Sequence, residues 1–147
     1  MEISNKMNGS QKRRILIIED EPDVMTYLST ILDDHGYEVE TAYDGDQAMK
    51  KIKETKPDLI SLDISLPTKT GINIYCELKE DPQLALIPVV MVTGIQKEFK
   101  KYIRTHNNLP PPEGYISKPF LVDELLNVIA RLLNQNNAGY VQSNNHQ

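Results

Sequence analysis

The sequence predicts an α/β protein built on a five-stranded parallel sheet with helices on both faces. Short apolar runs typical of buried strands alternate along the chain with segments whose apolar residues recur at helical spacing. Five such strand–helix pairs follow one another. Because parallel strands need crossover connections, this alternation is typical of a doubly wound sheet.

The composition fits one soluble globular domain. The chain has 147 residues, of which 39% are hydrophobic, 25% charged and 6% aromatic. Sixteen Lys and Arg against twenty-one Asp and Glu give a net charge of −5, which argues against nucleic acid or an anionic membrane surface as the main partner. The single cysteine, Cys76, cannot form an internal disulfide and is expected to be a small core residue. There is no signal-peptide core and no apolar run long enough for membrane insertion, so we expect a cytoplasmic protein.

Two polar ends frame the expected domain. Residues 1–12 show no apolar periodicity and are expected to form a flexible arm. Residues 135–147 are rich in Asn and Gln, carry no Lys, Arg, Asp or Glu, and are expected to be a disordered tail. The folded domain is therefore expected over residues 13–134.

The first strand–helix unit has clear signals. Residues 15–18 form a continuous β-branched and apolar run, typical of a strand covered on both faces. Pro22 suits the first turn of the helix that follows, and Gly36 provides its stop. Apolar residues at helical spacing lie between them: Val24, Leu28, Ile31 and Leu32.

The second and third units follow the same plan. Residues 37–43 predict a weaker strand, interrupted by two glutamates, which suits the edge of a sheet. Asp44 can cap the next helix, which must end before Pro57. Residues 59–62 predict the third strand, and Gly71 opens the helix after it. The inward residues of these two helices are Ala48, Met49 and Ile52, then Ile74, Tyr75 and Leu78.

The last two units surround an unusual proline segment. Residues 89–92 and 115–117 predict the fourth and fifth strands. Three consecutive prolines, Pro110–Pro112, cannot be helical and predict a stiff extended loop before the fifth strand. The fourth helix is expected from Ile95, Phe99, Tyr102 and Ile103, and the last from Leu125, Val128, Ile129, Leu132 and Leu133.

Polar residues stand at the carboxyl ends of four predicted strands. In a doubly wound sheet these ends meet in the crevice where the strand order reverses. Three carboxylates in one crevice repel one another unless a divalent cation and a lysine neutralise them. A ligand set that consists only of oxygen atoms suits Mg²⁺. The residues, in strand order, are Glu19-Asp20, Asp63, Thr93-Gly94 and Lys118-Pro119.

The same residues fit phosphoryl transfer. Asp63 can act as a carboxylate nucleophile that forms an aspartyl-phosphate. Mg²⁺ and Lys118 would balance the charge of the phosphoryl oxygens, and the Thr93 hydroxyl would donate a hydrogen bond to one of them. Gly94 has no side chain that obstructs the approach.

Four segments, in this order, resemble the receiver domains of two-component response regulators. They are IIEDEP at residues 17–22, DISLPTKTG at 63–71, VTG at 92–94 and KPF at 118–120. Each is a weak signal alone, whereas all four at the ends of predicted strands are a strong one. The resemblance covers roughly residues 13–134 and implies a flavodoxin-like sheet of strand order 2-1-3-4-5 with five helices.

The resemblance implies a role for each residue around the acceptor. Asp63 is the expected phosphoacceptor. Glu19 and Asp20 are the expected acidic pair that holds Mg²⁺, together with Asp63 and the backbone carbonyl of Ser65. Ser65 is also expected beside the phosphoryl group. Glu19 departs from the commoner aspartate at its position.

The remaining matched residues are expected to bind the phosphoryl group and to change conformation. Lys118 and Gly94 are expected to contact the group, and Lys118–Pro119 is expected to be a cis peptide. Thr93 is the expected switch hydroxyl, and Tyr115 matches the aromatic switch position. An ordinary core role for Tyr115 is the alternative.

The expected function is that of a stand-alone receiver. It would take a phosphoryl group onto Asp63 from a histidine kinase or histidine phosphotransfer protein and act on a downstream protein target, with no catalysis beyond its own phosphorylation and dephosphorylation. Ser65 and Ile95, at two positions that tune the phosphoryl lifetime in the family, predict slow autodephosphorylation. The alternatives are a phosphorelay intermediate, a receiver fragment of a longer regulator, a receiver that no longer accepts phosphate, a hydrolase and a nucleotide or flavin binder.

Overall fold

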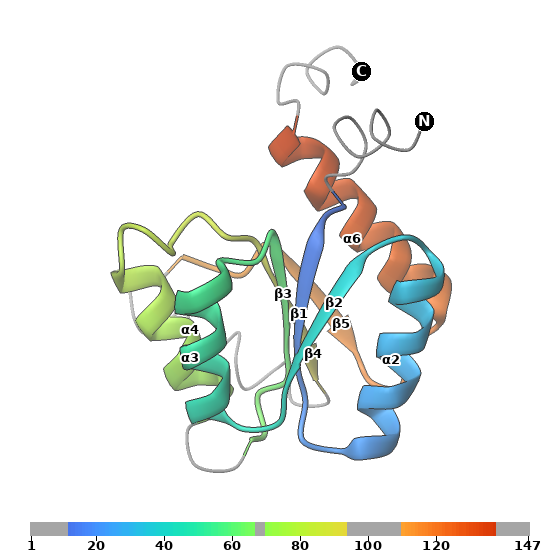
Figure 1. Cartoon of the computed structure of the whole chain (residues 1–147), viewed down its shortest axis with the longest axis horizontal. Helices are drawn as coiled ribbons and strands as arrows, with labels where there is room; N and C mark the ends of the chain where they lie inside the picture. Colours follow the sequence, from blue (N-terminus) through green and yellow to red (C-terminus); the bar gives the residue numbers. More distant parts are fainter. Residues whose placement is uncertain (1–11, 67–69, 94–109, 138–147) are drawn as a thin grey trace.

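The computed structural model describes residues 12–66, 70–93 and 110–137, and these residues form the predicted α/β fold (Figure 1). The strands are β1 (Arg14–Ile18), β2 (Glu38–Ala42), β3 (Leu59–Leu62), β4 (Val89–Thr93) and β5 (Gly114–Ser117). The helices within the described residues are α2 (Pro22–Asp34), α3 (Gly45–Thr55), α4 (Gly71–Glu80) and α6 (Val122–Asn137).

The five strands form one parallel sheet in the order β2-β1-β3-β4-β5, which confirms the predicted topology. β2 lies at the edge, as its two glutamates suggested. The chain moves from β1 outward to β2 and then returns to place β3 on the other side of β1. The strand order therefore reverses between β1 and β3, and a crevice is expected at the carboxyl ends of these two strands.

Helices cover both faces of the sheet, with α2 and α6 on one face and α3 and α4 on the other (Figure 1). Successive residues of a strand point to opposite faces, so both sets of strand residues are apolar. Facing α3 and α4, the buried strand residues include Leu16, Ile18, Ile60, Leu62 and Met91. Facing α2 and α6, they include Ile15, Ile17, Leu59, Val90, Val92 and Ile116.

Local signals in the sequence explain several element boundaries. The Asp44 side chain accepts a hydrogen bond from the Gln47 backbone N at 2.8 Å and so caps α3. Thr70 caps α4 in the same way through the Asn73 backbone N. Gly36 has a φ of +89°, a left-handed conformation that suits glycine and ends the turn after α2.

The structure differs from the expectations in two respects. α6 continues to Asn137, three residues into the segment 135–147 that was expected to be a tail, and no glycine or proline occurs between residues 134 and 137. Cys76 is half-buried rather than a core residue. The expected fourth helix, between Ile95 and Ile103, and most of both expected tails lie outside the described residues. No helix in the described ranges is long and apolar enough to cross a membrane.

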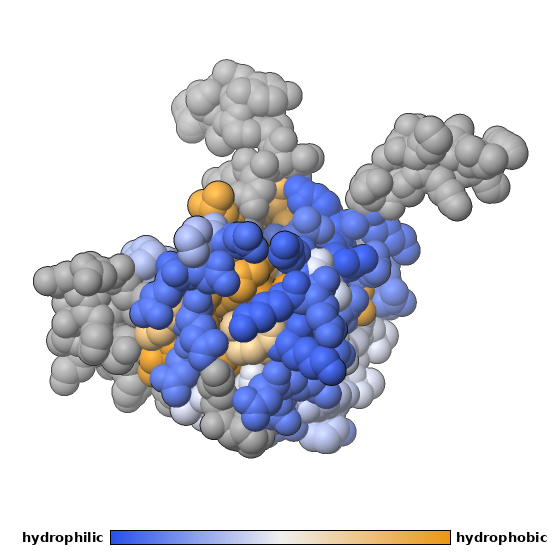
Figure 2. Space-filling model, turned by 60° about the vertical axis from the view of Figure 1, so that its left-hand side comes forward, coloured by the Kyte–Doolittle hydropathy of each residue, from blue (hydrophilic) through white to orange (hydrophobic). Residues whose placement is uncertain are grey.

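A groove lies between the carboxyl-terminal halves of α3 and α4. Its volume is about 440 Å³, and its lining residues are Met49, Lys53, Glu77, Glu80, Asp81 and Pro82. Figure 2 shows the side of the molecule that carries these helices, where hydrophobic residues are visible between bands of hydrophilic ones. The groove is at the opposite end of these helices from the crevice.

The cap of α3 gives a first prediction. Asp44→Ala removes the acceptor for the Gln47 backbone N and is expected to lower the free energy of unfolding by about 1 kcal/mol. Asp46→Ala in the same turn removes only a favourable interaction with the helix dipole and is expected to cost a few tenths of that. Urea unfolding of both variants measures the difference. Equal losses would contradict the assignment of Asp44 as the cap.

Candidate functional site

Sheet hydrogen bonds fix the backbone of two acidic residues just beyond the strand ends. The Glu19 N–H donates to the carbonyl oxygen of Ala42 at 3.0 Å, and the Asp63 N–H donates to that of Ile18 at 3.1 Å. Both bonds continue the ladders of β1 with its two neighbours. The positions of Glu19 and Asp63 therefore follow from strand order and register rather than from a loop of free conformation.

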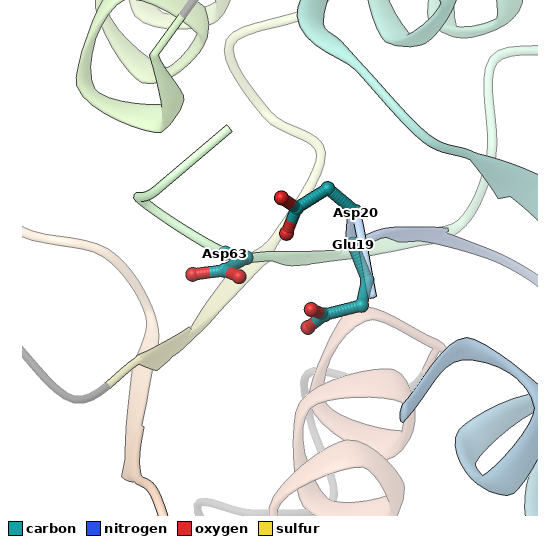
Figure 3. A group of neighbouring side chains, drawn as sticks. All are labelled: Glu19, Asp20 and Asp63. Atoms are coloured by element: carbon teal, nitrogen blue, oxygen red, sulfur yellow. The ribbon is translucent and has the colours of Figure 1, made fainter. Parts of the chain in front are cut away.

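Three carboxylates converge beyond the ends of β1 and β3 (Figure 3). One carboxylate oxygen each of Glu19, Asp20 and Asp63 lies within 4.8 Å of the other two. Glu19 is 2% exposed and Asp63 is 6% exposed, whereas Asp20 faces solvent. The sequence prediction that these three residues share one crevice thus agrees with the geometry.

Lys118 contacts two of the three acids. Its Nζ lies 3.1 Å from Glu19 Oε1 and 3.3 Å from Asp63 Oδ2. Lys118 directly follows β5, and its side chain reaches past the end of β4 to the crevice. The peptide bond between Lys118 and Pro119 is cis. One ammonium group thus contacts two nearly buried carboxylates, so the three acids and Lys118 together carry excess negative charge.

The pKa directions reflect this crowding. Burial raises the pKa of Glu19 above its ordinary value, and the neighbouring charge of Asp63 raises it further, while Lys118 opposes both effects. Burial alone would lower the pKa of Lys118, but attraction by Asp63 and Glu19 outweighs it and raises the pKa. Lys118 is therefore held as a cation in a site that still lacks positive charge.

The two oxygens of Asp63 have different surroundings. Oδ1 accepts a hydrogen bond from the Ser65 backbone N at 3.2 Å, and Oδ2 faces the Lys118 ammonium. Both contacts orient the carboxylate, and a fixed carboxylate is better placed for in-line attack on phosphorus. The Ser65 side chain is exposed beside it.

Gly71 supports the backbone that carries Asp63. Its N–H donates to the carbonyl oxygen of Ile64 at 2.8 Å. A Cβ at this position would lie 2.4 Å from the carbonyl oxygen of Asp63 and 2.6 Å from the Ile64 Cα. Only a residue without a side chain allows the start of α4 to approach the Asp63 backbone so closely. The sequence showed Gly71 as a helix start but not this contact, which depends on tertiary distance.

The donor set fits a magnesium ion. All three side chains offer hard oxygen ligands, and Mg²⁺ favours such ligands while keeping several of its own waters. The solvent-facing position of Asp20 gives those waters room. The excess negative charge of the cluster also favours a divalent cation.

The remaining predicted site residues are placed only in part. Thr93 is the last residue of β4, beside Ser117 of β5, but its side chain and Gly94 lie outside the described part of the structure. Tyr115 is half-buried and packs against the core on the α3 and α4 side, and burial raises the pKa of its hydroxyl.

The site therefore combines a nearly buried aspartate at the end of a central parallel strand with two further acids and a lysine. The sequence profile of the response regulator receiver domain matches residues 15–130. The chain belongs to this family, which confirms the resemblance, and it is therefore a receiver domain of two-component phosphorelay signalling.

Two of the chain's sequence relatives are regulatory proteins. The chain is 37% identical over 108 residues to the alkaline phosphatase synthesis transcriptional regulatory protein PhoP of Bacillus subtilis, a match that covers 74% of the chain and 43% of PhoP. It is 35% identical over 120 residues to the DNA-binding dual master transcriptional regulator RpaA of a Synechocystis strain, covering 82% of the chain and 48% of RpaA. The chain thus spans about half the length of these relatives.

A solved structure resembles the fold closely. It is the receiver domain of a sensor histidine kinase from Pseudomonas aeruginosa, with a magnesium ion coordinated in its active-site cleft. The TM-score is 0.73 at 25% identity, and the match covers 84% of this chain and 98% of that one.

The close approach at Gly71 gives a second prediction. Gly71→Ala forces the Asp63 backbone to move, and we expect it to lower the free energy of unfolding by about 2–3 kcal/mol. Gly36→Ala is the matched control, because a Cβ there meets nothing within 4 Å and only the positive φ costs about 1 kcal/mol. Urea unfolding separates the two, and a Gly71 variant as stable as the Gly36 variant would contradict the close approach.

The carboxylate cluster gives a third prediction. Asp20→Asn removes repulsion without removing a contact of Lys118, so the metal-free domain should gain on the order of 1 kcal/mol in stability at low salt. The gain should shrink in millimolar Mg²⁺, because the variant loses a ligand. Glu54→Gln, an exposed acid of α3, should show neither effect. Melting curves with and without Mg²⁺ measure this, and a less stable metal-free Asp20 variant would refute the repulsion.

Proposed function

We propose that this receiver accepts a phosphoryl group on Asp63 from a histidine kinase or histidine phosphotransfer protein. A carboxylate oxygen of Asp63 attacks the phosphorus of a phosphohistidine, the P–N bond breaks, and the imidazole leaves. Attack by water on the aspartyl-phosphate later releases inorganic phosphate and restores the carboxylate. The contact of Lys118 with both Glu19 and Asp63 is the observation that carries this proposal.

The residues around Asp63 would contribute to this reaction by stabilising charge and by holding Mg²⁺. Lys118 stands where it can transfer its contact from the carboxylate to a phosphoryl oxygen and stabilise the charge that develops there. Glu19, Asp20, Asp63 and the Ser65 carbonyl would hold Mg²⁺. When bound, the ion would neutralise charge on the carboxylates and the phosphoryl oxygens.

The phosphoryl group would then bias a conformational equilibrium. We infer that the Thr93 hydroxyl turns toward the new oxygens and that Gly94 leaves space for them, as in the family. Tyr115, half-buried beside the core, would move further inward. Two states that differ in this way would expose different surfaces near β5 and α6 to a protein partner.

The names of the relatives favour a second arrangement. PhoP is a transcriptional regulatory protein and RpaA a DNA-binding one, and the chain matches about half of each. The receiver of such a regulator would control an attached output domain, whereas a stand-alone receiver or relay intermediate would act on a separate protein. Phosphorylation of Asp63 is common to all three arrangements, and the net charge of −5 argues against direct contact of the receiver itself with nucleic acid.

Phosphorylation by a small donor tests the proposal. Acetyl phosphate with Mg²⁺ should add one phosphoryl group per chain, measured by intact mass, and Asp63→Asn should abolish the addition. Lys118→Gln should slow it on the order of a hundredfold. Lys53→Gln, a matched change at an exposed lysine of α3, should leave the rate unchanged. Addition that persists in the Asp63 variant would refute Asp63 as the acceptor.

The lifetime of the phosphoryl group gives a further prediction. Ser65 and Ile95 supply neither an acid nor an amide that can orient an attacking water, so autodephosphorylation should take minutes or longer. Ser65→Gln places an amide near the phosphoryl group and should shorten the half-life severalfold. Decay of the purified phosphoprotein in Mg²⁺ measures both. A half-life of seconds in the unaltered protein would refute slow hydrolysis.

A further inference from the structure

The proline loop, Pro110–Pro112, is attached to α4 through a buried tyrosine. Tyr75 has no exposed surface, and its hydroxyl donates a hydrogen bond to the backbone carbonyl of Pro110. A buried hydroxyl that loses its partner is costly. The position of the Tyr75 ring and the position of Pro110 are therefore tied to each other.

A buried lysine holds the other end of the loop. One oxygen of Glu113 accepts a hydrogen bond from the Val89 backbone N at 2.8 Å, and the other lies 3.3 Å from Lys79 Nζ. Lys79 also donates to the Ala85 carbonyl at 2.9 Å, and its side chain is 6% exposed. These contacts join Glu113 to α4, to the start of β4 and to the turn before it.

The segment between the two attachments is stiff. Proline fixes its own φ and also restricts the residue before it. Pro110 and Pro111 each precede another proline, and both are exposed, while Pro112 is buried. A shift of Pro110 is therefore passed along the segment to Glu113 rather than absorbed within it.

Tyr75 also lies close to the residue proposed to change position on phosphorylation. Tyr115 packs against the core cluster that contains Tyr75. Burial raises the pKa of Tyr75, and the neighbouring Glu113 and Tyr115 raise it further, which agrees with their proximity. An inward movement of Tyr115 must displace residues of this cluster, because a close-packed interior has no spare volume.

We propose that Tyr75 couples Tyr115 to the proline loop, so that phosphorylation of Asp63 displaces Pro110–Glu113 and the turn at Ala85–Leu86. The proposal rests on the function proposed above for Asp63 and Tyr115. Lys79 extends the effect to the turn because it contacts both Glu113 and the Ala85 carbonyl. The displaced surface includes Leu86, which is 87% exposed, and lies at the amino-terminal ends of β4 and β5, opposite the phosphorylation site.

Amide NMR of the ¹⁵N-labelled chain tests this coupling. The probe is Mg²⁺ with beryllofluoride, whose beryllium becomes tetrahedral when it binds a carboxylate oxygen and so mimics a phosphoryl group on that carboxylate. We expect the amide signals of Ser65, Glu113 and Leu86 all to shift when it is added. In Tyr75→Phe, which keeps the ring and removes the hydroxyl, the shifts of Glu113 and Leu86 should fall to less than half, while that of Ser65 is retained.

Tyr37→Phe is the matched control. Tyr37 is half-buried against the core on the other face of the sheet, so loss of its hydroxyl should leave all three shifts unchanged. A fall at Glu113 in this variant as well would overturn the specific role of Tyr75.

The remaining outcomes separate the two proposals. A shift at Ser65 without one at Glu113 or Leu86 in the unaltered protein would overturn the coupling and leave the phosphorylation site intact. No shift at Ser65 would overturn both. Equal shifts in the unaltered protein and Tyr75→Phe would overturn the proposed coupling through the Tyr75 hydroxyl. The first two outcomes are measured on the unaltered protein, so they remain decisive even if Tyr75→Phe fails to fold.

Discussion

The ion pairs that Lys118 forms with Glu19 and Asp63 are the interaction on which the site depends. Its ammonium lies 3.1 Å from one carboxylate and 3.3 Å from the other, and both acids are almost buried. Buried carboxylates this close together repel strongly, and a single cation offsets only part of that repulsion. The remaining negative charge is the physical reason for the site's fit to a divalent cation. The Asp63 carboxylate itself is held by two contacts, one with the Ser65 backbone N and one with the Lys118 ammonium.

The order of the strands in the sheet brings Lys118 within reach of Glu19 and Asp63. Because the order reverses between β1 and β3, the two acidic ends are neighbours, and hydrogen bonds from Glu19 and Asp63 to the adjoining strands fix their backbones. β5 lies two strands away from β3, and the Lys118 side chain reaches toward β3 so that its Nζ lies 3.3 Å from Asp63 Oδ2. Gly71 then allows α4 to start directly against the Asp63 backbone. The apolar cores on both faces hold the strands in register, and the charged side chains of the site lie at one edge of the sheet.

Much of this arrangement was predictable because it rests on signals that are local in the chain. The apolar runs at 15–18 and 59–62, the cap at Asp44 and the glycine at Gly36 each act within a few residues, and all agree with the structure. The acidic crevice was predicted by combining the strand assignments with the rule that the carboxyl ends of parallel strands meet where the strand order reverses. The contacts of Gly71 with the Asp63 backbone and of Tyr75 with Pro110 join residues whose proximity depends on tertiary packing, so no spacing in the sequence revealed them. The continuation of α6 into residues 135–137 was not expected either, since these residues are polar and show no apolar periodicity.

Chemical trapping tests the central claim most directly, because it identifies the residue that carries the phosphoryl group. Sodium borohydride reduces an aspartyl-phosphate to homoserine, and peptide mass spectrometry then locates the reduced residue. The account predicts homoserine at position 63 after treatment with acetyl phosphate and Mg²⁺, and unaltered acids at Glu19 and Asp20. Reduction at either of those two residues, or a phosphorylated protein in which borohydride reduces nothing, would contradict it.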